Sequence, residues 1–255
     1  MQLYKQYLPF AIELAKEAGE FIFPHAGKAG RQTLKAAKDF VTEMDVKVEK
    51  LIIQRIQDQY PEHRIFSEEA GSIDGKADLE WVIDPIDGTI NYSVGVPLYG
   101  VSIALTFQNQ PVVAAISLPA LGETYWAAKG EGAFQDGKPL KVRKAGLSEA
   151  FVSIGDFAKD GNTETNQERL NTIAHFVNDI YRLRMIGTAA VTLAYIASGR
   201  LDLGVYYKPN FYDIAAGELI IAEAGGTKKT AGNYTVFGHP QTAEQLIALL
   251  SKAAE

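Results

Sequence analysis

One short segment, residues 81–91 with the sequence WVIDPIDGTIN, constrains the possible folds of this 255-residue chain most strongly. It begins with apolar, β-prone residues that run directly into Asp84 and Pro85. Proline fixes φ and favours a turn, and Asp87 with Gly88 continues that turn. We therefore expect a strand to end here, with two carboxylates three residues apart that converge on one side of the strand end.

The ligand chemistry of this strand end suits a hard metal ion. Two aspartates offer only oxygen atoms, which Mg²⁺ prefers. The carbonyl oxygen of Ile86 lies between them and need not join a β-ladder, so it is a further candidate ligand. An ordinary turn is the alternative, because Asp-Pro and Asp-Gly pairs are common in turns. The segment alone leaves both interpretations open.

Other acidic residues occur where further elements are expected to begin or end. Glu68 and Glu69 follow a candidate strand, Asp213 begins a candidate helix, and Asp45 lies in the first turn of another helix. Each has a simpler explanation, because paired acids often form a solvated edge and a carboxylate interacts favourably with a helix N-terminus. The four histidines are scattered without metal-ligand spacing, so we do not expect a histidine metal site.

Composition limits the class of protein. Hydrophobic residues make up 47% of the chain and charged residues 22%, which is typical of a globular protein. The absence of cysteine excludes disulfides, thiolate nucleophiles and cysteine-based metal sites, and it fits a reducing compartment. The N-terminus is charged and no long apolar run occurs, so we expect neither a signal peptide nor a membrane span. A cytoplasmic location follows as the expectation.

Charge and motifs restrict the partners. The formal net charge of −6 argues against general nucleic-acid binding. The chain contains no nucleophile elbow, Walker loop or dinucleotide motif. An anionic substrate is still compatible with a negative protein, because bound cations invert the local field. We expect a small anionic substrate as the partner, with no nucleic acid and no membrane.

Periodicity predicts helices and strands in both halves of the chain. Helices are expected near 3–21, 44–56, 164–177, 189–197, 214–223 and 243–252, and strands near 63–67, 80–83, 101–107, 112–118, 124–127, 151–154, 182–186 and 201–207. Residues 27–38 read as a loop. A boundary near residue 147 is expected to separate an N-terminal lobe (1–147), with two helices, an antiparallel sheet and most of the acids, from a C-terminal α/β lobe (148–255).

In their order along the chain, these segments resemble the inositol monophosphatase family. WVIDPIDGTIN resembles the first signature of that family, and FYDIAAGELIIAEAGG (211–226) resembles the second. DFVTEMD, FSEEAG and IGTAAVTLAYIASGRLD match further blocks in the expected order, so the resemblance spans about residues 35–226. It implies a mixed α/β fold of the α+β class, layered as the α/β/α/β/α sandwich of the sugar-phosphatase type, and commonly a homodimer.

The resemblance also implies an activity. It indicates hydrolysis of a small phosphate monoester, such as inositol 1-phosphate or a related sugar(-alcohol) phosphate, by direct attack of a metal-activated water. Two to three Mg²⁺ ions per site are implied, with Mn²⁺ as a substitute and lithium as an inhibitor. Activity on fructose 1,6-bisphosphate, NADP or a 3′-nucleotide is an alternative. A non-catalytic metal-binding interaction protein is the alternative from another class.

Site residues follow from the resemblance position by position. The first metal would be held by Glu68, Asp84 and the carbonyl of Ile86, and the second by Asp84, Asp87 and Asp213. Asp45 and Thr89 would orient and deprotonate the water, with Glu68 and Glu69 as supporting acids. The substrate would contact Lys35, Asp87, Gly88, Thr89, Gly187, Thr188, Ala189 and Lys208. Without metal, we expect these carboxylates to be disordered or partly protonated.

One stretch departs from the family pattern. Inositol phosphatases carry a glutamate that binds ring hydroxyls shortly before the last metal-binding aspartate. Here residues 206–212 contain no acid and are one residue shorter, and Lys208 or Tyr207 lies nearest to that position. A lysine there would favour a second phosphate or another anionic group, so a preference for inositol phosphate does not follow from the resemblance.

Overall fold

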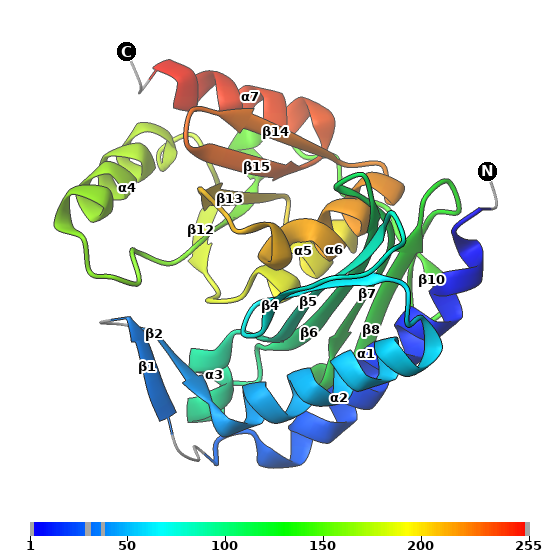
Figure 1. Cartoon of the computed structure of the whole chain (residues 1–255). Coiled ribbons are helices and arrows are strands. Elements are labelled where there is room, and N and C mark those ends of the chain that lie inside the picture. Colours follow the sequence, from blue (N-terminus) through cyan, green and yellow to red (C-terminus); the bar gives the residue numbers. More distant parts are fainter. Residues whose placement is uncertain (1–2, 29–31, 37–38, 253–255) are drawn as a thin grey trace.

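Five layers of secondary structure build the molecule (Figure 1). The structure is a computed structural model that describes residues 3–28, 32–36 and 39–252. Helices α1 (Leu8–Ile22) and α2 (Glu43–Gln59) cover an eight-stranded sheet, α5 (Ala189–Ala197) and α6 (Phe211–Glu223) lie between this sheet and a five-stranded sheet, and α4 (Thr163–Phe176) and α7 (Pro240–Lys252) cover the far side. The predicted α/β/α/β/α layering is confirmed.

The larger sheet brings two strand ends together. Its order is β10-β9-β8-β7-β6-β5-β3-β4. The strands are β3 (Arg64–Ser67), β4 (Gly71–Ile73), β5 (Leu79–Asp87), β6 (Gly100–Phe107), β7 (Gln110–Leu118), β8 (Glu123–Ala128), β9 (Ala133–Gln135) and β10 (Lys138–Pro139). The expected antiparallel sheet contains one parallel pair, because β3 runs parallel to β5 with Ser67 opposite Ile83. The residues that follow, Glu68 and Asp84, therefore emerge side by side.

The smaller sheet is mixed, as predicted. Its order is β12-β11-β13-β15-β14, with β11 (Phe151–Ile154), β12 (Arg182–Met185), β13 (Leu203–Tyr207), β14 (Thr227–Ala231) and β15 (Tyr234–Gly238). Strands β11, β12 and β13 are parallel, so their carboxyl ends share one edge. The boundary expected near residue 147 falls between the strands of the two sheets and stays a prediction, because α5 and α6 pack against both.

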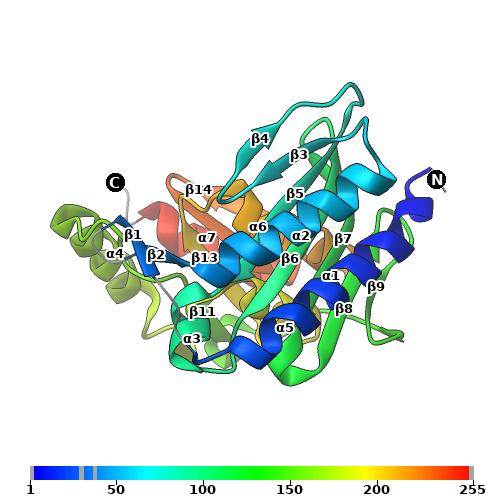
Figure 2. The ribbon, with the colours of Figure 1, turned by 60° about the horizontal axis from the view of Figure 1, so that its bottom comes forward.

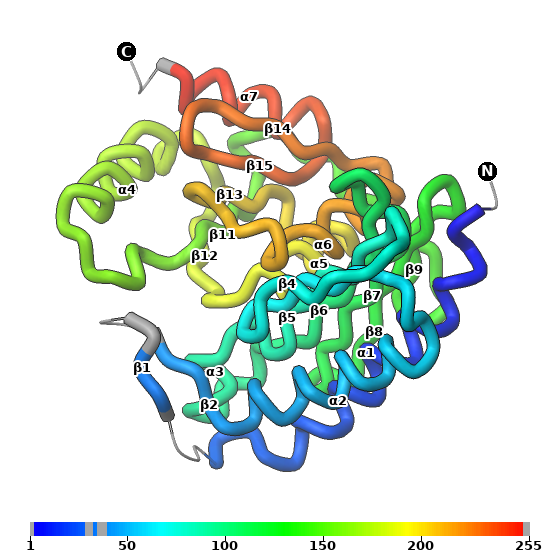
Figure 3. Tube along the Cα trace, in the orientation of Figure 1, coloured from blue at the N-terminus to red at the C-terminus, as the bar shows by residue number. Residues whose placement is uncertain are grey.

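Several elements were not expected from the sequence. Part of the expected loop 27–38 is a strand, β1 (Gln32–Ala36), which pairs with β2 (Asp39–Thr42). Figure 3 shows this hairpin beside α3 (Thr89–Val94). Strand β14 was also missed, because Thr-Lys-Lys-Thr has no apolar run, and its partner β15 was not predicted either. Short 3-10 turns occupy Lys5–Tyr7, Phe23–His25, Pro119–Leu121 and Leu147–Glu149.

Tight packing fixes the helices on the larger sheet. Figure 2 shows α1 and α2 side by side along one face of that sheet. In the middle layer, Gly217 on α6 meets Leu193 on α5 so closely that a Cβ atom at Gly217 would lie 2.5 Å from the Cβ atom of Leu193. Only glycine allows this approach, because real Cβ atoms do not come so near.

No helix in the described ranges is long and apolar enough to span a membrane.

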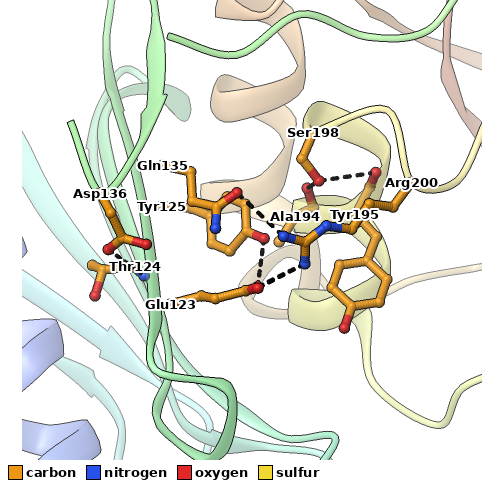
Figure 4. A network of polar contacts seen from close by, with 9 residues as sticks. All are labelled: Glu123, Thr124, Tyr125, Gln135, Asp136, Ala194, Tyr195, Ser198 and Arg200. Atoms are coloured by element: carbon orange, nitrogen blue, oxygen red, sulfur yellow. Dashed lines mark hydrogen bonds and ion pairs between the residues drawn. The ribbon is translucent and has the colours of Figure 1, made fainter. Parts of the chain in front are cut away.

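A polar network joins the end of α5 to the larger sheet (Figure 4). Arg200 donates from Nη1 to Glu123 at 2.8 Å, and the Tyr125 hydroxyl donates to the same carboxylate at 2.7 Å. The guanidinium group also lies over the ring of Tyr195, 5.0 Å from the ring centroid. Because Glu123 and Tyr125 belong to β8 and Arg200 follows α5, the network holds the middle layer against the sheet.

Candidate active site

A cavity of about 250 Å³ is lined by residues from both halves of the chain. The ends of β3 and β5 and the start of α3 form one wall. The residues after β11, the start of α5 and the segment from the end of β13 to the start of α6 form the other. Parallel strand ends and helix starts thus converge on one space, which is where ligands bind in many α/β folds.

Strand β5 differs from the expected turn at Asp84 and Pro85. The strand continues past Pro85 to Asp87, with an irregular register between Asp84 and Asp87. The chain turns one residue later, at Gly88, whose φ of 91° lies in the left-handed region that glycine adopts readily. A Cβ atom at Gly88 would also lie 3.1 Å from the Leu98 carbonyl oxygen. The bulge leaves the Ile86 carbonyl out of the ladder, and its oxygen lies 3.0 Å from the Thr89 hydroxyl oxygen.

Asp84 is the most constrained carboxylate of the cavity. It is 2% exposed, and its Oδ1 atom has no hydrogen-bond partner among the described residues. The Glu68 backbone N–H donates to the Ile83 carbonyl at 3.2 Å, which fixes the two strand ends next to each other. A buried carboxylate oxygen without a donor is unfavourable unless a cation compensates its charge.

Asp87 connects the two halves of the chain. Both of its carboxylate oxygens accept backbone N–H groups at the start of α5, from Ala189 at 3.2 Å and from Ala190. Thr188 caps the same helix, and its hydroxyl oxygen accepts from Val191 at 3.3 Å. The N–H group of Ala189 therefore already has a partner, although the residue lines the cavity beside Thr188.

The carboxylates of the cavity repel one another. Burial, and then the charges of Glu68, Asp87 and Asp213, raise the pKa of Asp84 well above its ordinary value. Burial and the charge of Asp213 raise the pKa of Asp87 to about 7. Burial and the charge of Glu68 raise the pKa of Asp213 to about 6, against the opposing charge of Lys159. The raised pKa values of these three aspartates agree with the expectation that the site is partly protonated without metal.

This donor set fits a divalent cation of the Mg²⁺ type. All of its candidate ligand atoms are oxygens, from Glu68, Asp84, Asp87, Asp213 and the Ile86 carbonyl. One of these oxygens, Oδ1 of Asp84, is buried and has no hydrogen-bond partner in the described part of the structure. Among the described residues, however, no three acidic or histidine side chains stand close enough to hold an ion as they are placed. Side chains must move to complete the coordination. Asp213 is placed for this at the third position of α6, which begins earlier than expected, at Phe211.

Asp45 and Thr89 form a hydrogen-bonded pair at the edge of the cavity. The Thr89 hydroxyl lies 3.2 Å from Asp45 Oδ1. Asp45 is fixed by a capping box at the start of α2, in which its other oxygen accepts the Thr42 backbone N–H at 2.9 Å. Burial raises the pKa of Asp45 despite these hydrogen bonds, so its carboxylate is a stronger base than usual. The catalytic role assigned to the pair stays a prediction.

Glu49 was missed by the sequence analysis. It lies on α2, one turn after Asp45, and is 4% exposed. It accepts hydrogen bonds from the hydroxyl of Ser67 and from the backbone N–H groups of Glu69 and Ala70, at 3.1 and 3.0 Å. Glu49 thus fixes both sides of Glu68. The only signal in the sequence was an acid on the apolar face of a predicted helix.

Three further residues, one that supports the cavity wall and two that line the cavity, also had no usable sequence signal. Asn91 donates from Nδ2 to the carbonyls of Leu98 and Ile186, both at 2.8 Å, and so anchors the loop before α5. Lys159 and Arg169 line the cavity from the region after β11. Asn91 lies on α3, Arg169 on α4 and Lys159 in the segment after β11, and the sequence does not reveal which of their side chains face the cavity.

Most of the predicted site residues line the cavity. They are Glu68, Asp84, Ile86, Asp87, Gly88, Thr89, Gly187, Thr188, Ala189, Lys208 and Asp213. Of the described residues, Asp45 and Glu69 do not form its lining: Asp45 reaches it through Thr89, and Glu69 sits in the turn beside Glu68. Lys35 belongs to β1, and its side chain lies outside the described part of the structure.

Comparison with known proteins gives a consistent set of relatives. The inositol monophosphatase family matches residues 3–245. A fructose-1,6-bisphosphatase/inositol-1-monophosphatase of Thermotoga maritima is 36% identical over 86% of this chain and 82% of its own. The Nus factor SuhB of Pseudomonas aeruginosa is 36% identical, over 86% and 83%. Two solved structures, a Thermotoga maritima IMPase and Mycobacterium tuberculosis SuhB, match with TM-scores of 0.87 and 0.84, each at 31% identity, covering 98% of this chain and 98% and 97% of theirs.

Proposed function

The chain belongs to the inositol monophosphatase family and is a phosphatase, and we propose that it hydrolyses inositol 1-phosphate or a related sugar(-alcohol) phosphate with bound Mg²⁺. The observation that carries this proposal is the buried, unpaired oxygen of Asp84 in a cavity that the carboxylates of Glu68, Asp87 and Asp213 also line. Such a cavity is suited to hold cations, and cations in turn attract a phosphate group.

The mechanism follows from what each residue contributes. Divalent cations held by these carboxylates would stabilise the charge of the phosphate and make a nearby water more acidic. Thr89 would orient the attacking water through its hydroxyl oxygen while it donates to Asp45, and Asp45 would receive the proton as the general base. Gly88 and Thr89 line the cavity, and their backbone N–H groups would donate to phosphate oxygens. Attack is direct, without a phosphoenzyme.

Phosphate release by the purified protein tests the proposal. Inositol 1-phosphate, fructose 1,6-bisphosphate, NADP and adenosine 3′,5′-bisphosphate would each be assayed with Mg²⁺ and with EDTA. We expect release from at least one substrate in Mg²⁺ and none in EDTA. Folded, metal-loaded protein that releases phosphate from none of them would contradict the proposal and favour a non-catalytic metal-binding protein.

Glu49 provides a test of how the metal ligands are positioned. Removing its carboxylate in Glu49→Ala frees the turn that carries Glu68, so we expect the Mg²⁺ concentration for half-maximal activity to rise about tenfold or more, as for other residues that orient ligands. Glu49→Gln keeps an oxygen acceptor and should recover part of the loss. Glu43→Ala, an exposed change on the same helix, is the control. Equal Mg²⁺ dependence in all three variants would show that Glu49 has only a structural role.

We also propose the identity of the metal ion, the oligomeric state and the cellular location. Mg²⁺ is the preferred ion because the donor set contains only oxygen, with Mn²⁺ as a substitute and lithium as a competitor. A homodimer is supported by the exposed apolar side chains of Ile90, Val94 and Val96 on and after α3. A cytoplasmic location is supported by the cysteine-free composition.

A further inference from the structure

One hydroxyl group beside the cavity has no hydrogen-bond partner. Tyr206 lies on β13 and lines the cavity together with Asp87 and Asp213. Its side chain is 9% exposed, and its hydroxyl oxygen is buried without a partner among the described residues. Burying a polar group in this way is unfavourable, and most buried hydroxyl groups are hydrogen-bonded. No step of the proposed catalysis uses this group, so its unpaired state needs another explanation.

Packing on several sides fixes the ring of Tyr206. A Cβ atom at Gly204 would lie 3.1 Å from its Cε2 atom, and a Cβ atom at Gly155 would lie 3.5 Å from its Cδ1 atom. The ring of Phe237 meets it edge-on, with the two ring centroids 5.9 Å apart. A side chain packed in this way keeps its orientation. The hydroxyl group therefore cannot turn away to find solvent or another partner.

The charges that act on this hydroxyl belong to the cavity. Thr192 is a neighbour, but its own hydroxyl donates to the Thr188 carbonyl at 2.8 Å. Burial raises the pKa of Tyr206 despite this neighbour, and the charges of Asp87 and Asp213 raise it further. The phenol therefore keeps its proton and is available as a hydrogen-bond donor. The two carboxylates that act on it are those assigned to the second metal position.

Asp213 is the carboxylate that is free to move towards this donor. Asp87 is held at the start of α5, because both of its oxygens accept backbone N–H groups there. Asp213 Oδ2 accepts from the side chain of Asn210 at 3.1 Å, just before α6 begins. Because no three acidic side chains in the described ranges stand close enough to hold an ion, metal binding requires a movement. A carboxylate that binds a metal is commonly held by a hydrogen bond as well.

We propose that Tyr206 is a positioning residue of the metal site, whose hydroxyl donates to Asp213 when that side chain moves to bind Mg²⁺. The inference rests on the metal site of the proposed function and adds no step to catalysis. The hydrogen bond satisfies the buried hydroxyl only in the metal-loaded protein, so it stabilises the loaded state relative to the metal-free state. Removing the hydroxyl should therefore weaken Mg²⁺ binding without destabilising the metal-free protein.

Tyr206→Phe tests this role, because it removes the hydroxyl and keeps the ring. We expect the Mg²⁺ dissociation constant, measured by calorimetry, to rise about tenfold or more, as for other residues that orient ligands. In EDTA the variant should melt no lower than the parent, because the lost hydroxyl has no partner in the described part of the metal-free structure. A residue with only a structural role would show the opposite: a lower Tm in EDTA and unchanged Mg²⁺ binding.

Tyr99 provides a matched control. It is 1% exposed, and its hydroxyl oxygen is likewise buried without a partner among the described residues. It is not one of the described residues that line the cavity, and its pKa is raised by burial. Tyr99→Phe should therefore melt no lower than the parent in EDTA, as Tyr206→Phe should, but its Mg²⁺ dissociation constant should not change.

The possible outcomes separate this inference from the proposed function. An unchanged Mg²⁺ dissociation constant in Tyr206→Phe, or an equal rise in Tyr99→Phe, would overturn it. So would weaker Mg²⁺ binding together with a lower Tm in EDTA, because damage to the fold would then explain the loss. Weaker binding with an unchanged or higher Tm would support it even if no substrate is hydrolysed. A parent protein that binds no Mg²⁺ would overturn the metal site and this inference together.

Discussion

Replacing Asp84 with asparagine is expected to lower kcat by ~10³-fold or more while the protein stays folded. Asp84 is the carboxylate assigned to both metal positions, and asparagine offers one neutral oxygen in place of two charged ones. Because the metals supply much of the stabilisation of the phosphate in the transition state, losing the shared ligand removes several kcal/mol of it. Phosphate release at saturating substrate over a range of Mg²⁺ concentrations measures the effect.

Thermal stability provides the control for this variant. Burial and neighbouring charges raise the folded-state pKa of Asp84, so the folded state binds this proton more tightly than the unfolded state does. The carboxyl group therefore lowers the stability of the metal-free protein progressively as the pH rises above the ordinary value of 3.8. Asparagine carries no such proton, so metal-free Asp84→Asn should melt no lower than the parent at pH 7.5. Mg²⁺ should raise the Tm of the parent much more than that of the variant.

Near-normal kcat in Asp84→Asn would contradict the metal assignment. So would an equal Mg²⁺-induced rise in Tm for parent and variant, because binding to the folded state stabilises in proportion to affinity. If Asp84→Asn unfolds in the absence of metal, this would contradict burial and neighbouring charges as the cause of the raised pKa of Asp84. The two measurements thus test the electrostatics and the ligand role separately.

Local patterns explain why part of the site could be predicted from sequence. Asp84, Ile86 and Asp87 belong to one strand end, so their proximity is fixed within four residues. The capping box of Thr42 and Asp45 is also local, and it fixes Asp45 in the first turn of α2, as predicted. Helix α5 was predicted to the residue, because its run of small and apolar residues is also a local pattern.

The missed parts depend on contacts between distant segments. Glu49 acts on a turn about 20 residues further along the chain, and nothing near it indicates this contact. Arg169 is held at the cavity by contacts with distant residues, the ring of Tyr207 and the backbone carbonyl of Asp156. The parallel pairing of β3 with β5 is equally non-local, because β4 lies between them in sequence. Short strands rich in lysine and threonine, such as β14, lack the apolar pattern that marks a buried strand.

Replacing Thr89 with valine is expected to lower kcat by ~10²–10³-fold with little change in the Mg²⁺ concentration for half-maximal activity. Valine keeps the shape of threonine but removes the hydroxyl that joins Asp45 to the attacking water. Thr89→Ser retains the hydroxyl and should keep most of the activity. A fall in kcat with unchanged Mg²⁺ dependence distinguishes this effect from that of Asp84→Asn, where both change.

The double variant shows whether Thr89 and Asp45 act as one unit. If Asp45 receives the proton only through Thr89, then Asp45→Asn should lower kcat about as much as Thr89→Val, and the double variant should be little worse than either single one. Multiplicative losses would mean that the two residues act independently, and the hydrogen bond of 3.2 Å would then only hold α2 against α3. The pair joins helix α2 to helix α3 at the cavity wall, so non-additive losses would make helix α2 part of the catalytic machinery through Asp45.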